Sequence, residues 1–280
     1  MDWLTDEKIP VGKWSKTFVD WLTDNGGFFF IPLETGLGWL IDALLWCFQA
    51  PHPLIAVAAI TALAFFLRRS FTFAAIIALG LLFIINQGYW EETTETLTLV
   101  VASAIICMAI GVPIGIALAH RPWAFTIARP ILDLMQTLPT FVYLIPAIIF
   151  FGIGMVPGLV ATVVFVIPAS IRLTHLGISS TPKNLIEAGQ AFGSSPRQLL
   201  WKIELPYAMP QIMAGLTQTI MLSLSMVVIA ALVGADGLGK PVVRALNTVN
   251  TSLGFEAGFV IVIVAILLDR LLRAREGRKP

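Results

Sequence analysis

The chain has 280 residues, of which 57% are hydrophobic and only 12% are charged, and its formal net charge is +1. A water-soluble domain carries about 25% charged residues because most of its surface faces solvent. This composition therefore excludes an ordinary soluble enzyme and predicts a protein that faces lipid over most of its surface. We expect the lipid bilayer to be one partner, and we expect no nucleic-acid partner.

The first fifty residues differ from the rest of the chain. The tetrapeptide WLTD occurs at 3–6 and again at 21–24, where Trp, Leu and Phe alternate with charged residues. This pattern suits a helix in the membrane interface, and a loosely ordered tail is the open alternative. Residues 28–48 are apolar but include Glu34 and Asp42, each of which costs about 2.5–3.5 kcal/mol near the bilayer centre. We therefore expect an interfacial or re-entrant segment at 28–48, not a full span.

Seven apolar segments follow, each close to the roughly 20 residues that cross a bilayer core of about 30 Å. They lie at 51–67, 71–87, 97–119, 131–151, 157–173, 211–233 and 254–272. The predicted fold class is therefore an all-α integral membrane protein. Its two regions are an acidic, amphipathic N-terminal tail with the interfacial segment, 1–50, and a transmembrane domain, 51–280. Gly111 and Gly115 have the small-xxx-small spacing that lets membrane helices pack closely.

Basic residues fall in every second predicted loop, and this pattern predicts the orientation. Arg68 and Arg69 follow the first span, Arg121 follows the third, and further Lys and Arg residues follow the fifth and the last. The intervening loop at 88–96 has three acidic residues and no Lys or Arg. Since Lys and Arg mark cytoplasmic loops, we expect the N-terminus outside and the C-terminus inside the cell.

An amphipathic stretch interrupts the apolar sequence between the fifth and sixth spans. Thr181-Pro182 predicts a helix start, with Thr as N-cap and Pro at the first helical position. Leu185, Ala188 and Phe192 follow at spacings of three and four, so they share one helical face. Gly193 comes next, and glycine is the residue best suited to the left-handed conformation that ends a helix.

A second helix is predicted directly after this glycine. Ser195 at the N-cap and Gln198 three residues later form the pattern of a capping box. Leu199 and Ile203 share one face of this helix, which we expect to break at Leu205-Pro206. The pair of helices suits a groove in a partner protein, and a surface helix that only covers the bundle is the open alternative.

The residue order in this stretch resembles the EAA signature of ATP-binding-cassette importer permeases, Glu-Ala-Ala-x3-Gly-x9-Ile-x-Leu-Pro. The matching positions are Glu187, Ala188, Gly189, Gly193, Ile203, Leu205 and Pro206. Only Gly189 departs from that form, and a small residue is retained there. The resemblance implies that residues 174–210 form a cytoplasmic coupling loop seated in an ATPase subunit, with these seven positions as the ATPase-coupling residues.

Segments at 129–158, 172–178 and 224–239 resemble the permeases for glycine betaine, proline betaine and choline. This resemblance implies a type I importer fold in a bacterial inner membrane. The implied partners are a second permease copy in a homodimer, an ABC ATPase and an external substrate-binding protein. The chain itself has no GxxxxGK[ST] phosphate-binding loop, so we expect no enzyme activity and no cofactor here, with ATP and Mg²⁺ bound by the ATPase.

A quaternary ammonium substrate favours aromatic faces over salt bridges. Trp90, Phe141 and Tyr143 are therefore candidates to line the pathway, with packing or interface anchoring as the alternative. The spans have almost no charge in their middles, whereas proton- or ion-driven carriers usually show intramembrane ionisable residues. The alternatives kept open are a permease for another small solute, such as an amino acid, and a stand-alone channel or secondary carrier with the loop as a regulator's docking site.

No catalytic residues are predicted, because no Ser, His and Asp set has plausible proximity. His52, His120 and His175 stand apart in different predicted loops. Metal sites need clustered ligands, so no metal site is predicted either.

Overall fold

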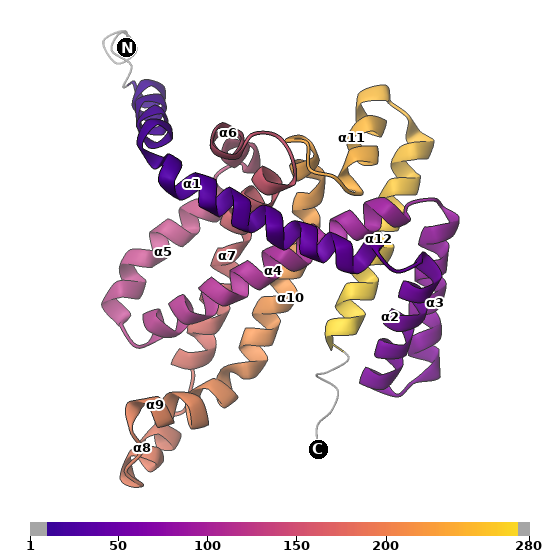
Figure 1. Ribbon diagram of the computed structural model, residues 1–280. Helices are drawn as coiled ribbons and strands as arrows, with labels where there is room; N and C mark the ends of the chain where they lie inside the picture. The colour runs from indigo at the N-terminus through magenta and orange to yellow at the C-terminus, as the bar shows by residue number, and fades with distance from the viewer. Residues whose placement is uncertain (1–9, 274–280) are drawn as a thin grey trace, which may run out of the picture.

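The computed structural model describes residues 10–273, and every regular element within that range is helical. The first WLTD tetrapeptide, at 3–6, and the basic residues of 274–280 lie outside the described residues. Three helices, α4 (Trp90–Ala119), α7 (Met155–Ser179) and α10 (Leu205–Ala231), pack on one another at the centre of the molecule (Figure 1). The other helices surround this trio.

The surrounding elements are mostly shorter. They are α1 (Val11–Gln49), α2 (Pro53–Arg68), α3 (Phe71–Asn86), α5 (Pro122–Thr137), α6 (Thr140–Phe151), α8 (Lys183–Ala191), α9 (Pro196–Leu199), the π turn η2 (Leu200–Glu204), α11 (Gly239–Thr248) and α12 (Thr251–Arg273). Helix α11 lies between the last two predicted spans. Its strongly amphipathic sequence carries Lys and Arg, so it does not stand out as a span.

Small residues bring the central helices into close contact. A Cβ atom added to Gly111 of α4 would lie 2.0 Å from Oγ of Ser170 on α7, and one added to Gly115 would lie 2.7 Å from a backbone oxygen of α7. The hydroxyl of Ser103 on α4 also donates to the hydroxyl of Ser223 on α10, at 2.8 Å. The close packing predicted from the small-xxx-small spacing is therefore confirmed.

The predicted span at 131–151 is not one continuous helix, and whether it crosses once stays a prediction. The chain forms α5 and α6 instead, with an angle of 93° between them. Leu138 has extended angles, φ −62° and ψ 135°, and precedes Pro139. A residue before proline is pushed out of the helical region because the proline ring clashes with its backbone, and this breaks the helix.

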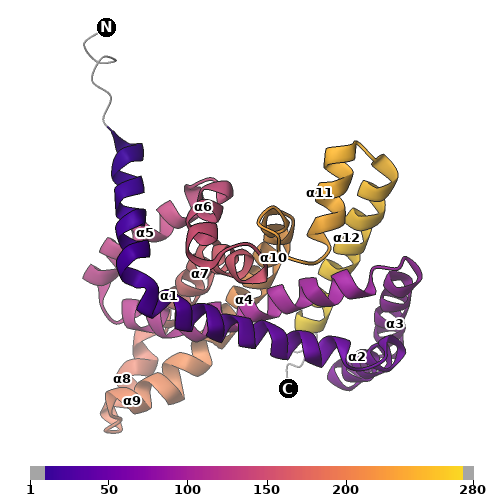
Figure 2. The ribbon, with the colours of Figure 1, turned by 45° about the horizontal axis from the view of Figure 1, so that its top comes forward.

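Helix α1 also differs from the prediction. The separate interfacial or re-entrant segment expected at 28–48 is part of one continuous helix, Val11–Gln49, with Pro32 inside it. Of this helix, Gly12–Gln49 is long and apolar enough to cross a membrane. Figure 2 shows that α1 bends, so that its first part points away from the bundle while the rest runs along α4. There Ile41 packs against α4 and α7.

Helices α2 and α3 are shorter than the predicted full spans. Each has 16 residues, which corresponds to about 24 Å at 1.5 Å per residue. Five longer helices in the described range are apolar enough to cross a membrane, or six if the bent α5–α6 pair is one span. The count of seven crossings stays a prediction.

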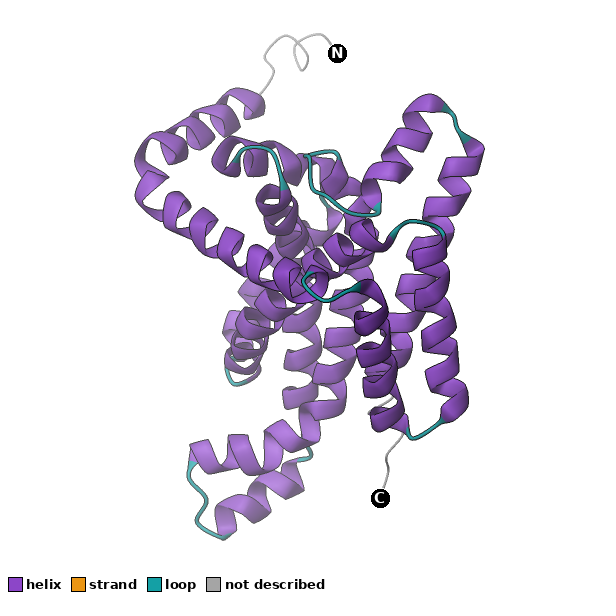
Figure 3. Cartoon of the chain, turned by 45° about the vertical axis from the view of Figure 1, so that its right-hand side comes forward, coloured by secondary structure: helices purple, strands orange, loops and turns teal. Residues whose placement is uncertain are grey.

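The two ends of the molecule match the predicted sides. The α8–α9 hairpin projects from the body at the end where α12 finishes, and the α11–α12 turn and the start of α1 lie at the opposite end (Figures 1 and 3). The segments predicted to be cytoplasmic therefore share one end. We call the other end, with the α11–α12 turn, the outer end.

Candidate functional site

Residues Lys183–Glu204 form a helical hairpin, which we call the α8–α9 hairpin. Its first helix begins one position later than predicted: Pro182 is the N-cap and Lys183 is the first helical residue. Pro182 has ψ 131°, outside the helical region, so the prediction of Thr181 as N-cap is wrong. Thr181 is buried instead, 6% exposed.

The corner of the hairpin is formed by Gly193, which has the predicted left-handed conformation with φ +75°. The N–H of Gly193 donates to the carbonyl of Gln190 at 2.9 Å, and the N–H of Ser194 donates to the carbonyl of Gly189 at 3.0 Å. This pair of hydrogen bonds is the Schellman motif, which satisfies carbonyls that the last helical turn leaves open. The predicted corner is therefore confirmed.

The second helix starts with the predicted capping box. The N–H of Gln198 donates to Oγ of Ser195 at 3.4 Å, and the N–H of Ser195 donates to Oε1 of Gln198 at 2.8 Å. These bonds satisfy two backbone donors that the first helical turn leaves open. The direction in which α9 leaves the corner is thus set by local sequence.

The inner side of the hairpin depends on Gly189. This residue is buried, and an added Cβ atom would lie 2.6 Å from Cδ2 of Leu199 and 2.6 Å from Cδ1 of Ile203. The two helices therefore touch where α8 has no side chain. The close approach expected of a small residue at this position is confirmed.

The hairpin exposes large apolar side chains among polar and charged ones. Phe192 is 91% exposed, Trp201 67% and Leu185 42%, and the side chains of Glu187 and Ala188 are also exposed. A helix that only covered the bundle would bury its apolar face against it. Exposed apolar groups beyond the body of a protein are typical of a surface that binds another protein.

The hairpin continues into α10 without the break predicted at Leu205-Pro206. Pro196–Ala231 runs as one stretch of 36 residues. The π turn, Leu200–Glu204, lies directly before Pro206 and lets the backbone accommodate a residue that has no N–H to donate. Leu205 packs on the cluster around Ala208, and Pro206 is exposed. One continuous helix thus joins the hairpin to the centre of the bundle.

The sequence reading missed a contact between this junction and α4. Glu204 is 8% exposed, and its Oε2 lies 2.9 Å from Nε2 of His120. Nδ1 of His120 lies 2.9 Å from the carbonyl oxygen of Ile116. The two ring nitrogens of His120 thus connect the carboxylate of Glu204 to the backbone of α4. The sequence pattern does not reveal this partner of His120.

Glu204 occupies the variable position between Ile203 and Leu205 of the motif, so the motif did not single it out. His175 was also placed in a loop, but it lies within α7 and stacks on Phe125, with ring centroids 3.6 Å apart. Within 10–273, no group of three or more His, Cys, Asp or Glu side chains could hold a metal ion. The absence of a metal site stays a prediction.

The three candidate pathway residues are not brought together. Trp90 packs on the main core cluster, and Tyr143 packs on a separate cluster around Leu144. The hydroxyl of Tyr143 donates to the carbonyl of Met135 at 2.7 Å and so ties α6 to α5 across the bend. Phe141 is 58% exposed. Their role in lining a pathway stays a prediction.

Residues 111–278 match the family of binding-protein-dependent transport system inner membrane components. The match covers more than half of the chain, including the α8–α9 hairpin, α10 and α12. The chain belongs to this family. It is thus a multi-pass inner membrane component of a transporter, and the family predicted from the motif is confirmed.

Named relatives match the permease over nearly its whole length. It is 46% identical to the glycine betaine/carnitine transport permease protein GbuB of Listeria monocytogenes, over 95% of each chain. It is 46% identical to the glycine betaine transport system permease protein OpuAB of Bacillus subtilis, over 97% of this chain and 96% of the relative. It is 43% identical to the glycine betaine/proline betaine transport system permease protein ProW of Escherichia coli, over 95% and 75%.

The fold is that of a type I ABC importer permease. A chain of the MetNI methionine ABC transporter, solved in an inward-facing conformation, aligns with a TM-score of 0.61 and 25% identity, over 67% of this permease and 95% of the solved chain. A second crystal form of the same transporter aligns with a TM-score of 0.57, over 65% of the permease. The predicted fold class is therefore confirmed.

Proposed function

We propose that this permease is the membrane-spanning subunit of an ATP-driven importer of small quaternary ammonium zwitterions of the betaine class. The observation that carries the proposal is the identity of 43–46%, over about 95% of the chain, to three permeases whose names all specify glycine betaine. Carnitine and proline betaine, the other substrates in those names, are also zwitterions that combine a quaternary ammonium with a carboxylate. The location we propose is a bacterial inner membrane.

The α8–α9 hairpin is the part that a separate ABC ATPase would grip, with Glu187, Ala188, Gly189, Gly193, Ile203, Leu205 and Pro206 as the coupling positions. Its exposed apolar side chains and its projection from the body support this role. Its Schellman corner and capping box give it a fixed shape, which a rigid-body coupling element needs.

Closure of two ATPases on ATP would displace both hairpins in a dimer of permeases. Because the hairpin runs into α10 without a break, and α10 packs on α4 and α7, the displacement would rotate the central helices as a unit. ATP and Mg²⁺ would bind only to the ATPases. An external binding protein would deliver the solute to the outer end.

Reconstitution tests the proposal. The permease is purified with its ATPase, placed in liposomes, and supplied with its binding protein and radiolabelled glycine betaine. Accumulation that requires ATP and the binding protein supports the proposed function. Accumulation without ATP or without the ATPase contradicts it and favours a channel or secondary carrier.

The choice of solute is tested in the same liposomes. The resemblance in fold to a methionine transporter makes methionine the matched alternative cargo. ATP-driven uptake of methionine but not of glycine betaine would support an ATP-driven importer and refute the proposed substrate class.

A further inference from the structure

A half-enclosed pocket of about 310 Å³ lies at the outer end, between the start of α4, the loop that leads to α11, and α11 itself. We call it the outer pocket. Its charged and aromatic lining consists of Tyr89, Glu91, Glu92, Glu95, Asp236, Lys240 and Arg244. Its volume is at the small end of the range for small-molecule sites, about 300–1,000 Å³.

The charges of the outer pocket are only partly used within the protein. Lys240 donates to Asp236, one turn earlier along the chain. In the part of the chain that the structure describes, Glu92, Glu95 and Arg244 form no side-chain hydrogen bond or ion pair, and one carboxylate oxygen of Glu92 is buried without a partner. Polar groups in a protein interior are normally paired. The buried oxygen of Glu92 therefore lacks a partner that a ligand would supply, while Glu95 is half-buried and Arg244 is exposed at the mouth of the pocket.

Tyr89 is an independent indication of a ligand. It is more than nine-tenths buried, 8% exposed, and it lines the pocket. Its hydroxyl has no hydrogen-bond partner among the described residues. Burial, followed by the negative charges of Glu256 and Glu92, raises the pKa of Tyr89 against a smaller opposing effect of Arg244. The hydroxyl therefore stays protonated, lies among the charged groups, and is free to donate.

The chemistry of the lining matches a zwitterion with an onium group. A quaternary ammonium has no N–H to donate, so it is attracted by the electrostatic field of carboxylates and by an aromatic ring. The unpaired Glu92 and Glu95 and the ring of Tyr89 supply both. A carboxylate at the other end of the same molecule would accept from the Arg244 guanidinium and from the Tyr89 hydroxyl, which are the free donors.

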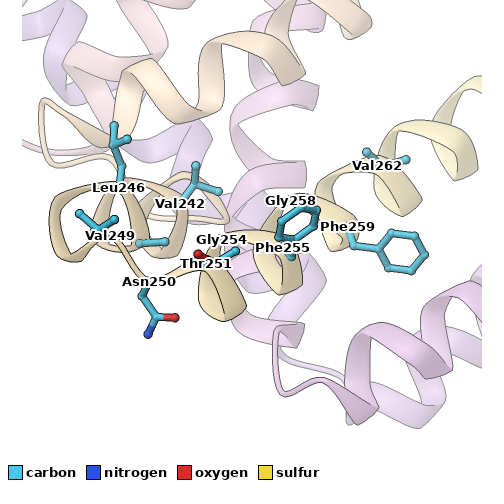
Figure 4. A pocket seen from close by; sticks show the side chains of 11 residues that line it. Val242, Leu246, Val249, Asn250, Thr251, Gly254, Phe255, Gly258, Phe259 and Val262 are labelled. Atoms are coloured by element: carbon cyan, nitrogen blue, oxygen red, sulfur yellow. The ribbon is translucent and has the colours of Figure 1, made fainter.

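A larger, apolar groove nearby does not share this chemistry. It measures about 740 Å³ and lies between α11 and α12 (Figure 4). Its lining includes Leu246, Val249, Phe255 and Phe259 and has no charged side chain. Such a surface suits hydrocarbon, not a charged solute. The outer pocket is smaller than this groove. Unlike the groove, it is lined by both acidic and basic side chains.

We propose that the outer pocket is a solute site of the permease itself, which receives a betaine-class zwitterion at the outer end as the external binding protein releases it. This proposal rests on the proposed function. It assigns the onium group to Glu92, Glu95 and the ring of Tyr89, and the substrate carboxylate to Arg244 and the hydroxyl of Tyr89.

Direct binding to the permease–ATPase complex in nanodiscs, without the binding protein, tests the assignment. The probes are radiolabelled glycine betaine and radiolabelled choline, which has the same onium group but no carboxylate. Arg244→Gln should weaken glycine betaine binding about tenfold and leave choline binding unchanged, because only the carboxylate contact is removed. Glu95→Gln should weaken both. Lys16→Gln on the exposed part of α1 is the charge-matched control and should change neither.

Three outcomes would overturn the proposal: no saturable glycine betaine binding to the wild-type complex, equal binding by all variants, or equal loss of both probes in Arg244→Gln. A variant that binds the probes normally but has lost affinity for the binding protein would show a docking surface instead, which also overturns it. ATP-driven uptake is measured in parallel. Wild-type uptake of glycine betaine without direct binding would refute the pocket and leave the proposed function intact, whereas absent uptake would refute the proposed function.

Discussion

Replacement of Gly193 tests whether the shape of the α8–α9 hairpin determines coupling. At φ +75°, a residue with a Cβ atom pays a backbone penalty of about 1–2 kcal/mol. No atom lies within 4 Å of the position that the Cβ would occupy, so no clash adds to this penalty. The cost is therefore a property of the backbone alone. It should be highest for β-branched valine and lower for asparagine, which tolerates the left-handed region.

A penalty of this size shifts the balance between the native corner and other conformations by about 5–30-fold. Gly193→Val should insert normally into the membrane but lose association with the ATPase, or hydrolyse ATP without solute uptake. Gly193→Asn should be intermediate. The assays are co-purification of the ATPase and ATP-driven uptake into liposomes.

The matched control is Gly36→Val on α1. Gly36 also has open space around its Cβ position but no positive φ, so the same substitution lacks the left-handed penalty. Full coupled uptake by Gly193→Val would refute the reasoning. So would equal damage from Gly193→Asn and Gly193→Val, because the penalty would then not come from the left-handed backbone.

Three further predictions concern the body of the permease. Gly111→Leu should overpack the contact between α4 and α7 by about 1–3 kcal/mol or more, which should lower the midpoint of thermal unfolding in detergent. His120→Ala leaves the buried carboxylate of Glu204 unpaired and should lower the free energy of unfolding by about 1–3 kcal/mol. The double variant with Glu204→Gln should lose less than the sum of the two single variants. Additive losses in denaturant unfolding would contradict the pair. The orientation is tested in a variant without the two native cysteines. A cysteine at the exposed position Glu91 should react with an impermeant maleimide from outside intact cells, and one at the exposed position Arg121 only after permeabilisation. The reverse labelling would overturn the orientation.

Local patterns in the sequence were sufficient for much of the hairpin. The capping box of Ser195 and Gln198 and the left-handed Gly193 depend on contacts between residues three to five positions apart. Such contacts form wherever the local segment becomes helical, so the sequence predicts them directly. The membrane class follows in the same way from composition, because lipid-facing surface cannot carry the usual share of charge.

Apolar length alone does not show whether a segment is one helix. The segment at 131–151 is mostly apolar, and hydropathy does not reveal that Leu138-Pro139 divides it into two helices at 93°. The acids Glu34 and Asp42 do not separate a short segment from the rest, since α1 runs through both without a break. A charged side chain raises the free energy of placing its residue in lipid, but it does not by itself end a helix.

What the sequence alone determined is the membrane class, the predicted sides of the loops and the hairpin motif, since each depends on residues close together in the chain. Only the tertiary structure decided which distant residues meet. It paired His120 with Glu204, 84 positions apart, and set Gly111 against Ser170. It also gathered Tyr89 and Arg244 around one pocket. Those contacts arise from how α4, α7, α10 and α11 pack, and a linear pattern contains no record of that packing.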